Sequence, residues 1–156
     1  MVALRGKEID AFLARPDAGR PIILLYGPDA GLVRERADAL VASAVDDPND
    51  PFSLVRLDGD GLSAEPSRLV DEAMTIPMFG GRRAIRVRAG SKNFASGIDT
   101  LADSSIKDCR VVIEAGEKPI EGPTASLAGS VTVNGRLGVD HGVMAYAEDR
   151  RFSAKV

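Results

Sequence analysis

The sequence predicts an α/β domain in which helices cover both faces of a mainly parallel sheet. The first indication is the apolar run Pro-Ile-Ile-Leu-Leu-Tyr at residues 21–26, which is typical of a strand buried on both faces of a parallel sheet. The second is the amphipathic helix pattern at residues 32–45 that follows it. The third is the alternation of strand and helix patterns along the chain, which right-handed crossovers would connect.

The individual elements follow from local patterns. Apolar residues at helical spacing indicate an opening helix at residues 7–15. Pro66 suits the first turn of a helix that continues to residue 74, and a shorter helix is expected at residues 95–101. Strand patterns occupy residues 22–26, 54–58, 84–87, 111–115 and 143–147. We therefore expect a five-stranded, mainly parallel sheet with helices on both faces.

The domain organisation follows from length and punctuation. The chain has 156 residues and 44% hydrophobic content, enough for one domain. Residues 117–142 are interrupted by glycines and show no period, so no element is assigned there. The polar segment after residue 147 ends abruptly at Val156. We expect a single domain over residues 1–156 that is truncated relative to a longer protein.

Composition limits the compartment and the partners. The chain has no apolar run long enough to span a membrane and no secretory signal, so a cytoplasmic protein is expected. Its single cysteine, Cys109, cannot form an internal disulfide or a thiolate zinc site alone. A net charge of −3 argues against a free-standing nucleic-acid binder.

One region is nevertheless basic. Residues 73–98 contain no carboxylate and five basic residues, Arg82, Arg83, Arg86, Arg88 and Lys92. Direct DNA binding through them is one interpretation, but they could equally form a solvated strand face. The carboxylate-rich residues 38–72 would also repel a duplex.

The turn after the first strand lies where nucleotide-binding folds hold phosphate. A working phosphate-binding loop needs a Lys and a Ser or Thr, and both are absent from Gly27-Pro28-Asp29-Ala30-Gly31-Leu32-Val33. Pro28 removes an N–H donor and Asp29 adds a carboxylate. We expect no nucleotide hydrolysis and no cofactor here. The alternative is a nucleotide- or flavin-binding enzyme that uses the turn formed by Gly27, Pro28, Asp29 and Gly31.

No catalytic constellation or metal cluster is visible in the sequence. Asp58 and Asp60 flank Gly59 at a strand end, where a solvated Asp-Gly turn is expected rather than a metal or catalytic site. His141 is the single histidine and is set among glycines without a nearby Cys, His or Glu partner. We therefore predict neither catalytic nor metal-binding residues.

Two segments together resemble a known family. They are Leu-Leu-Tyr-Gly-Pro-Asp-Ala-Gly-Leu-Val-Arg-Glu-Arg-Ala at residues 24–37 and Ala-Met-Thr-Ile-Pro-Met-Phe-Gly-Gly-Arg-Arg at residues 73–83. In this order and spacing they resemble the amino-terminal domain of the delta subunit of bacterial DNA polymerase III, a clamp-loader subunit. The likeness runs from about residue 4 to residue 114.

The resemblance implies a fold like that of AAA+ ATPases with a degenerate phosphate loop and no ATPase activity. It also implies a role in DNA replication as part of the DNA polymerase III holoenzyme, a nucleotidyltransferase. The domain would contact DNA only indirectly, through its partners. The implied partners are the sliding clamp (beta subunit) and the tau/gamma and delta prime subunits. Residues 117–142 depart from the family pattern, and the lid and collar domains of the family are not in this chain.

The resemblance further implies clamp contact through Met78 and Phe79. Pro77 and the pair Gly80-Gly81 would force the chain out of its helix and present the two apolar side chains to solvent. Arg82 and Arg83 would then provide electrostatic support by steering the approach to an acidic partner surface.

Overall fold

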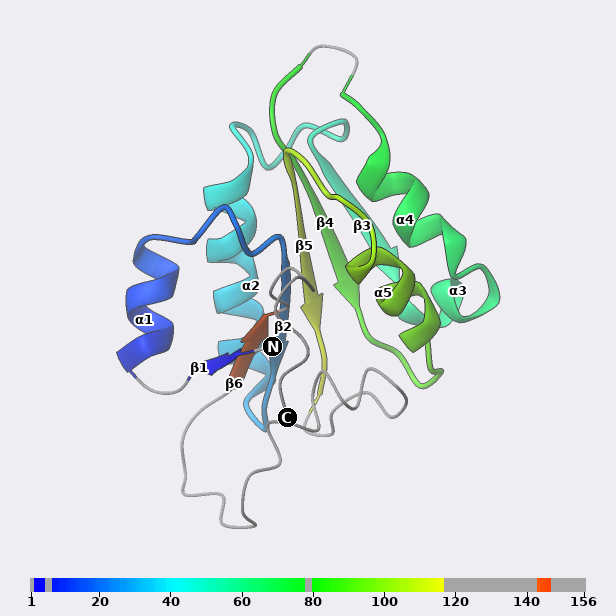
Figure 1. Cartoon of the computed structure of the whole chain (residues 1–156). Helices are drawn as coiled ribbons and strands as arrows, with labels where there is room; N and C mark the ends of the chain where they lie inside the picture. The colour runs from blue at the N-terminus through cyan, green and yellow to red at the C-terminus, as the bar shows by residue number, and fades with distance from the viewer. Residues whose placement is uncertain (1, 5–6, 78–79, 117–142, 147–156) are drawn as a thin grey trace, which may run out of the picture.

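The computed structural model of the chain describes residues 2–4, 7–77, 80–116 and 143–146. They form one three-layer domain (Figure 1). The elements in chain order are β1 (Val2–Leu4), α1 (Lys7–Ala14), β2 (Ile22–Tyr26), α2 (Ala30–Ala44), β3 (Leu54–Asp58), α3 (Gly59–Ala64), α4 (Ser67–Met74), β4 (Arg83–Arg88), α5 (Ala95–Ala102), β5 (Cys109–Glu114) and β6 (Val143–Tyr146). Within the described residues, no helix is long and apolar enough to cross a membrane.

The sheet has six strands in the order β1-β6-β2-β5-β4-β3. Neighbouring strands from β2 to β3 pair in parallel, whereas β6 pairs antiparallel with both β2 and β1. The expected five-stranded sheet is therefore corrected to six strands, of which four are parallel. The strand expected at residues 143–147 exists but runs in the opposite direction, because strand direction depends on the path of the connecting chain and not on strand periodicity. The short strand β1 carries no pattern that would predict it.

The four parallel strands define two edges of the sheet, the carboxyl edge and the amino edge. The carboxyl edge holds the loops that follow these strands, including the turn at residues 27–29 after β2 (Figure 1). The amino edge holds the loops that precede them, including the α4 to β4 connection at residues 75–82. In Figure 1 the amino edge is at the top.

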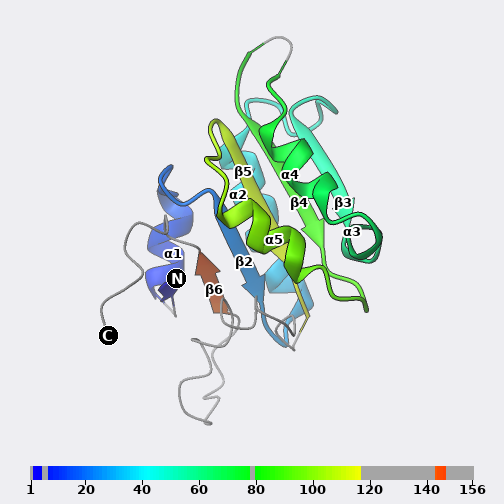
Figure 2. The same ribbon diagram turned by 45° about the vertical axis from the view of Figure 1, so that its right-hand side comes forward.

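Helices cover both faces of the sheet, as predicted (Figure 2). On β2, Ile22 and Leu24 pack into the core beneath α4 and α5, whereas Ile23 and Leu25 pack into the core beneath α1 and α2. This alternation explains why β2 is apolar at successive positions, since each face of a doubly covered strand is buried. All four side chains are at most 7% exposed.

Helix α3 corrects the expectation of a simple turn at Gly59. Residues 59–64 form a short helix whose N-cap is Asp58, with its carboxylate accepting from the Gly61 N–H at 3.4 Å. Gly59 is buried, and a Cβ there would lie 2.8 Å from the ring of Phe94. Close packing of the backbone against Phe94 therefore requires glycine and overrides its low helix propensity.

Candidate functional site

The turn on the carboxyl edge is closed by the chain's own carboxylate. Asp29 is the N-cap of α2, and its Oδ1 accepts a hydrogen bond from the Leu32 N–H at 2.9 Å. A helix N-terminus binds phosphate through N–H groups of this kind and through its positive dipole. Asp29 occupies that position, and a Cβ at Gly31 would lie 3.2 Å from its Oδ1. A phosphate would have to displace a bound negative charge.

A second carboxylate on the same edge is also occupied. Glu114 ends β5, the parallel neighbour of β2, and is 8% exposed. Active phosphate-loop enzymes use a strand-end carboxylate of this kind to hold Mg²⁺. Here the Arg86 guanidinium forms ion pairs with both Glu114 and Asp38. Glu114 is thus engaged by a cation of the chain itself.

Arg86 is held strongly in this triad. Burial alone would lower its pKa, but hydrogen bonds and charge from Glu114 and Asp38 outweigh burial and raise the pKa above its ordinary value. Glu114 and Asp38 were not among the predicted site residues. The position of Glu114 at the end of a buried strand could have indicated it, since a buried carboxylate needs a partner. The described part of the chain contains no cluster of three or more His, Cys, Asp or Glu side chains that could hold a metal.

The two aspartates considered as site candidates have structural partners. Asp58 caps α3, and Asp60 accepts a hydrogen bond from the Lys92 N–H at 2.7 Å. Asp60 therefore anchors the loop after β4. His141 lies outside the described residues.

The predicted clamp-binding turn lies on the amino edge, between α4 and β4. Met78 and Phe79 themselves lie outside the described residues, so their exposure stays a prediction. Their flanks are described: the Gly80 N–H donates to the Pro77 carbonyl at 3.1 Å. Gly80 and Gly81 have φ values of 72° and 93°. This left-handed backbone disfavours other residues, so the glycine pair is required by the path into β4.

Three apolar side chains near this turn face solvent. Ile76 is 86% exposed, Phe52 69% and Met74 49%. None of the three was a predicted site residue. Phe52 lies in the loop that precedes β3, which begins at Leu54. We call Phe52, Met74 and Ile76 the apolar cluster.

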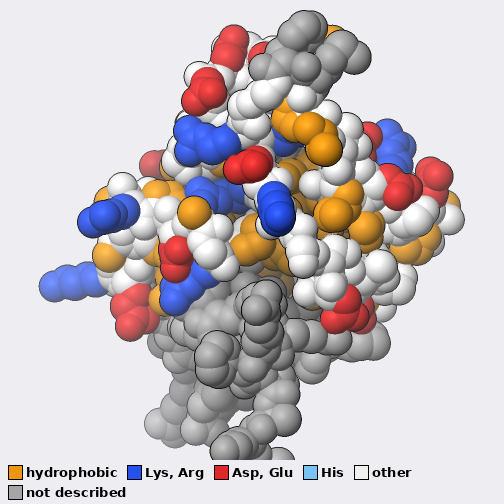
Figure 3. Space-filling view, turned by 45° about the horizontal axis from the view of Figure 1, so that its top comes forward, with side chains coloured by type: hydrophobic (Ala, Val, Ile, Leu, Met, Phe, Trp, Pro, Cys, Tyr) orange, Lys and Arg blue, Asp and Glu red, His pale blue; other side chains and the backbone are white. Residues whose placement is uncertain are grey.

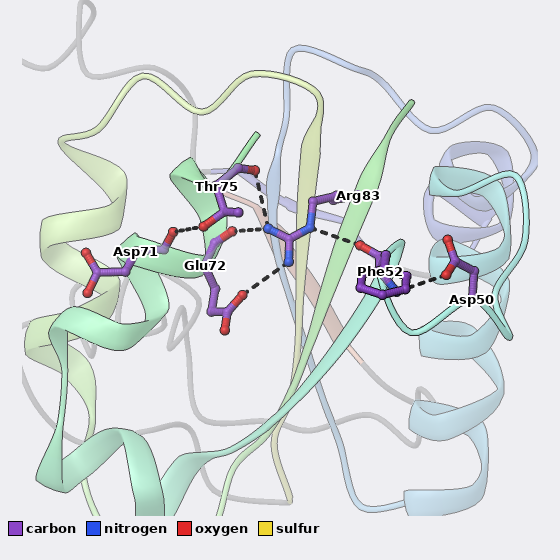
Figure 4. A network of polar contacts seen from close by, with 6 residues as sticks. All are labelled: Asp50, Phe52, Asp71, Glu72, Thr75 and Arg83. Carbon is purple, nitrogen blue, oxygen red and sulfur yellow. Dashed lines mark hydrogen bonds and ion pairs between the residues drawn. The ribbon is translucent and has the colours of Figure 1, made fainter. Parts of the chain in front are cut away.

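Arg83 joins the two segments that carry the apolar cluster (Figure 4). Its guanidinium donates to the carbonyls of Phe52 at 3.2 Å, Glu72 at 2.7 Å and Thr75 at 3.3 Å, and pairs with the Glu72 carboxylate at 3.1 Å. Arg83 is only 7% exposed. It therefore ties the loop before β3 to the end of α4 and is not a surface charge, contrary to the supporting role expected for it.

Arg82 is the surface residue of the pair. Its guanidinium lies 3.4 Å from the Asp46 carboxylate, and the two side chains are 56% and 80% exposed. Exposed pairs of this kind contribute little to stability. Arg82 thus remains available to a partner.

The fold places the protein in the class of α/β domains, with four adjacent parallel strands between two helical layers. The part of the carboxyl edge that is described holds no free phosphate-binding turn. A solved structure of this fold is the DNA clamp loader delta protein of Bacillus subtilis (YqeN), with 22% identity and a TM-score of 0.58 over 72% of this chain. The match covers 36% of that protein, so the chain spans little more than a third of its length.

A second similar structure is a DNA polymerase III gamma subunit-related protein from Thermotoga maritima. It is 12% identical, with a TM-score of 0.49, and the match covers 70% of this chain and 38% of that one. No family model matches the chain, and no curated protein matches it. The resemblance to clamp-loader delta seen in the sequence is confirmed at the level of the fold by the Bacillus subtilis structure.

Proposed function

We propose that this chain is the amino-terminal domain of a clamp-loader delta subunit and that it acts in DNA replication by binding the sliding clamp. The observation that carries the proposal is the apolar cluster: Met74 and Ile76 precede the predicted clamp-binding residues in the chain, and Arg83 ties the Phe52 carbonyl to the same connection. Exposed apolar side chains grouped at one place are typical of protein interfaces, whose energy is dominated by a few such anchors.

The rigid frame of the cluster supports this role. Arg83 fixes the end of α4 against the loop before β3, so Phe52 and Ile76 are carried by segments that cannot move independently. Preorganisation of this kind reduces the entropy lost on binding. Arg82 would steer the approach to an acidic clamp surface, affecting association rate more than final affinity.

A role without catalysis is supported by the carboxyl edge. Asp29 fills the helix end that would bind phosphate, and Arg86 engages Glu114. These contacts argue against the alternative of a nucleotide- or flavin-binding enzyme. We further propose that the longer protein assembles with tau/gamma and delta prime subunits in the cytoplasm and meets DNA only indirectly.

Direct DNA binding through residues 82–92 receives less support. The five basic residues do not form one surface, because Arg83 is buried and Arg86 is paired. Arg82 lies on the amino edge, whereas Arg88 ends β4 on the carboxyl edge. A duplex could not contact all five together.

The proposal is tested by measuring clamp affinity of the double variant Met78→Ala/Phe79→Ala. Burial of two such side chains contributes roughly 1.5–3 kcal/mol each, so we expect binding to weaken by on the order of 100-fold or more. Leu32→Ala, on the opposite edge, is the control and should leave affinity unchanged. Unchanged affinity in the double variant would place the site elsewhere. A large loss of thermal stability would instead assign Met78 and Phe79 to the core.

A further inference from the structure

A cavity of about 380 Å³ opens on the amino edge, apart from the apolar cluster. Its volume is in the range of small-ligand pockets, roughly 300–1,000 Å³. Apolar lining comes from Pro21, Ala44, Ile106 and Cys109. Burial raises the pKa of the Cys109 thiol to about 11, with the Arg83 charge opposing the shift, so the thiol is neutral at physiological pH. The lining thus combines apolar side chains and a neutral thiol with Arg83, whose charge is paired with Glu72.

Basic side chains from three segments also line this cavity. Arg82 precedes β4, Lys107 precedes β5 and Arg110 lies on β5, and Asp108 is the acidic residue among the lining residues. Figure 3 looks toward the amino edge and shows Lys and Arg side chains grouped near the centre of the view, beside hydrophobic ones. Charges from distant parts of the sequence thus converge on one hollow.

Two of these cations, Lys107 and Arg110, form no ion pair with a carboxylate of the described residues. Arg110 donates to the Asp17 carbonyl at 3.1 Å and to the Ser43 hydroxyl at 3.4 Å, and both acceptors are neutral. Lys107 is exposed and makes no hydrogen bond or ion pair with the described residues. By contrast, Arg83 forms an ion pair with Glu72, and Arg82 forms one with Asp46.

The environment of Arg110 favours an added anion. Burial lowers its pKa, and repulsion from Arg82 lowers it further, while Asp17 opposes the shift. Burial and the Arg82 charge both disfavour the charged guanidinium of Arg110 relative to a guanidinium in water. An anion bound between Arg110 and Arg82 would offset both the burial and the repulsion. The apolar part of the lining would strengthen that attraction, because it lowers the local dielectric constant.

We propose that this cavity binds a phosphate group, either free or in a nucleic-acid backbone, between Lys107 and Arg110, with Arg82 at its rim. The doubly charged form of phosphate matches two uncompensated cations, and Arg and Lys are the side chains that proteins use for phosphate. The site lies on the edge opposite the turn at Asp29. It goes beyond the proposed clamp binding and does not depend on it.

The test is a titration of the whole chain, followed by ¹H–¹⁵N NMR, with two probes at physiological ionic strength. Inorganic phosphate is the first probe, and an oligothymidylate without terminal phosphates is the second. We expect millimolar phosphate to shift the amide signals of residues 106–110. Competition between the probes would identify the backbone as a source, whereas phosphate binding alone would identify a small phosphate ligand.

Variants give the second readout. Lys107→Gln and Arg110→Gln should each weaken phosphate binding about tenfold, the effect of losing one charge-assisted hydrogen bond. Lys107 makes no hydrogen bond or ion pair with the described residues, so its variant keeps the test valid if Arg110→Gln fails to fold. Arg56→Gln and Arg88→Gln remove the same charge from exposed positions on β3 and β4 and should change affinity less than about twofold.

Three results would overturn the site. The first is the absence of shifts with phosphate. The second is an oligonucleotide response that leaves residues 106–110 unmoved. The third is an equal loss of affinity in the Lys107 variant and the two controls, since this would mean that phosphate senses only net charge.

Discussion

The two edges of the sheet differ in how completely their charged and apolar groups are satisfied. On the carboxyl edge, Asp29 bonds the start of α2, and Arg86 bonds both Glu114 and Asp38. On the amino edge, Ile76 and Phe52 remain exposed, and Lys107 and Arg110 have no anionic partner in the described part of the chain.

This difference between the edges bears on which of them retains groups that can bind a ligand or a partner. Open parallel sheets ordinarily bind ligands outside the carboxyl ends of their strands. In the part of that edge that the structure describes, Asp29 and Glu114 are engaged by internal contacts. The amino edge keeps groups whose free energy would improve on contact with a partner or an anion. Both of our proposals therefore place function with these unsatisfied groups and not at the fold's usual site.

The largest effect on stability is expected for Arg83→Met on the amino edge. This change leaves the Glu72 carboxylate and three carbonyls without their donor, so we expect the free energy of unfolding to fall by about 3 kcal/mol. Urea denaturation measures it. Arg88→Met, an exposed position on the same strand, should change stability by less than about 0.5 kcal/mol. Equal effects of the two changes would show that Arg83 does not join α4 to the loop before β3.

A smaller effect is expected at Asp29 on the carboxyl edge. Asp29→Ala removes the N-cap of α2 and should lower the free energy of unfolding by about 1 kcal/mol, whereas Asp29→Asn keeps the cap and should cost only a few tenths. Thermal or urea unfolding separates the two.

The same Asp29 variants test whether the carboxyl edge is closed only by Asp29. We expect neither variant to bind ATP with Mg²⁺, because no lysine or hydroxyl of a phosphate loop stands in this turn. Calorimetric titration measures this. Micromolar ATP binding by either the variants or the original chain would favour the nucleotide-binding alternative.

The smallest effect on stability is expected for Arg82→Gln. Its pair with Asp46 is exposed on both sides, so the free energy of unfolding should change by less than about 0.5 kcal/mol. Clamp association should slow severalfold at low salt and approach the original rate at high salt, since steering is screened. Stopped-flow or surface-binding kinetics at two salt concentrations measure it. A rate that is independent of salt would remove Arg82 from the steering role.

Much of the fold could be predicted because its signals are local. The buried run of β2, the amphipathic pattern of α2 and the strand pattern of β5 each arise from neighbouring residues. Glycines at residues 59 and 61 concealed α3, since its stability comes from packing against Phe94 and from the Asp58 cap. The lack of a phosphate-loop lysine and hydroxyl in the turn after β2 could be inferred from the sequence, because it depends only on residue types.

The sequence alone determined the layered α/β class, the positions of the strands β2 to β5 and the missing lysine of the phosphate turn, because periodicity and residue identity depend on positions close together in the chain. Only the tertiary structure decided the direction of β6, the burial of Arg83 and the partners of Glu114. Arg83 meets Phe52 from 31 residues away, and Arg86 meets Asp38 from 48 residues away. Two adjacent arginines with the same local signal, Arg82 and Arg83, therefore came to lie on the surface and in the interior, because long-range packing and not local sequence sets which charge is desolvated.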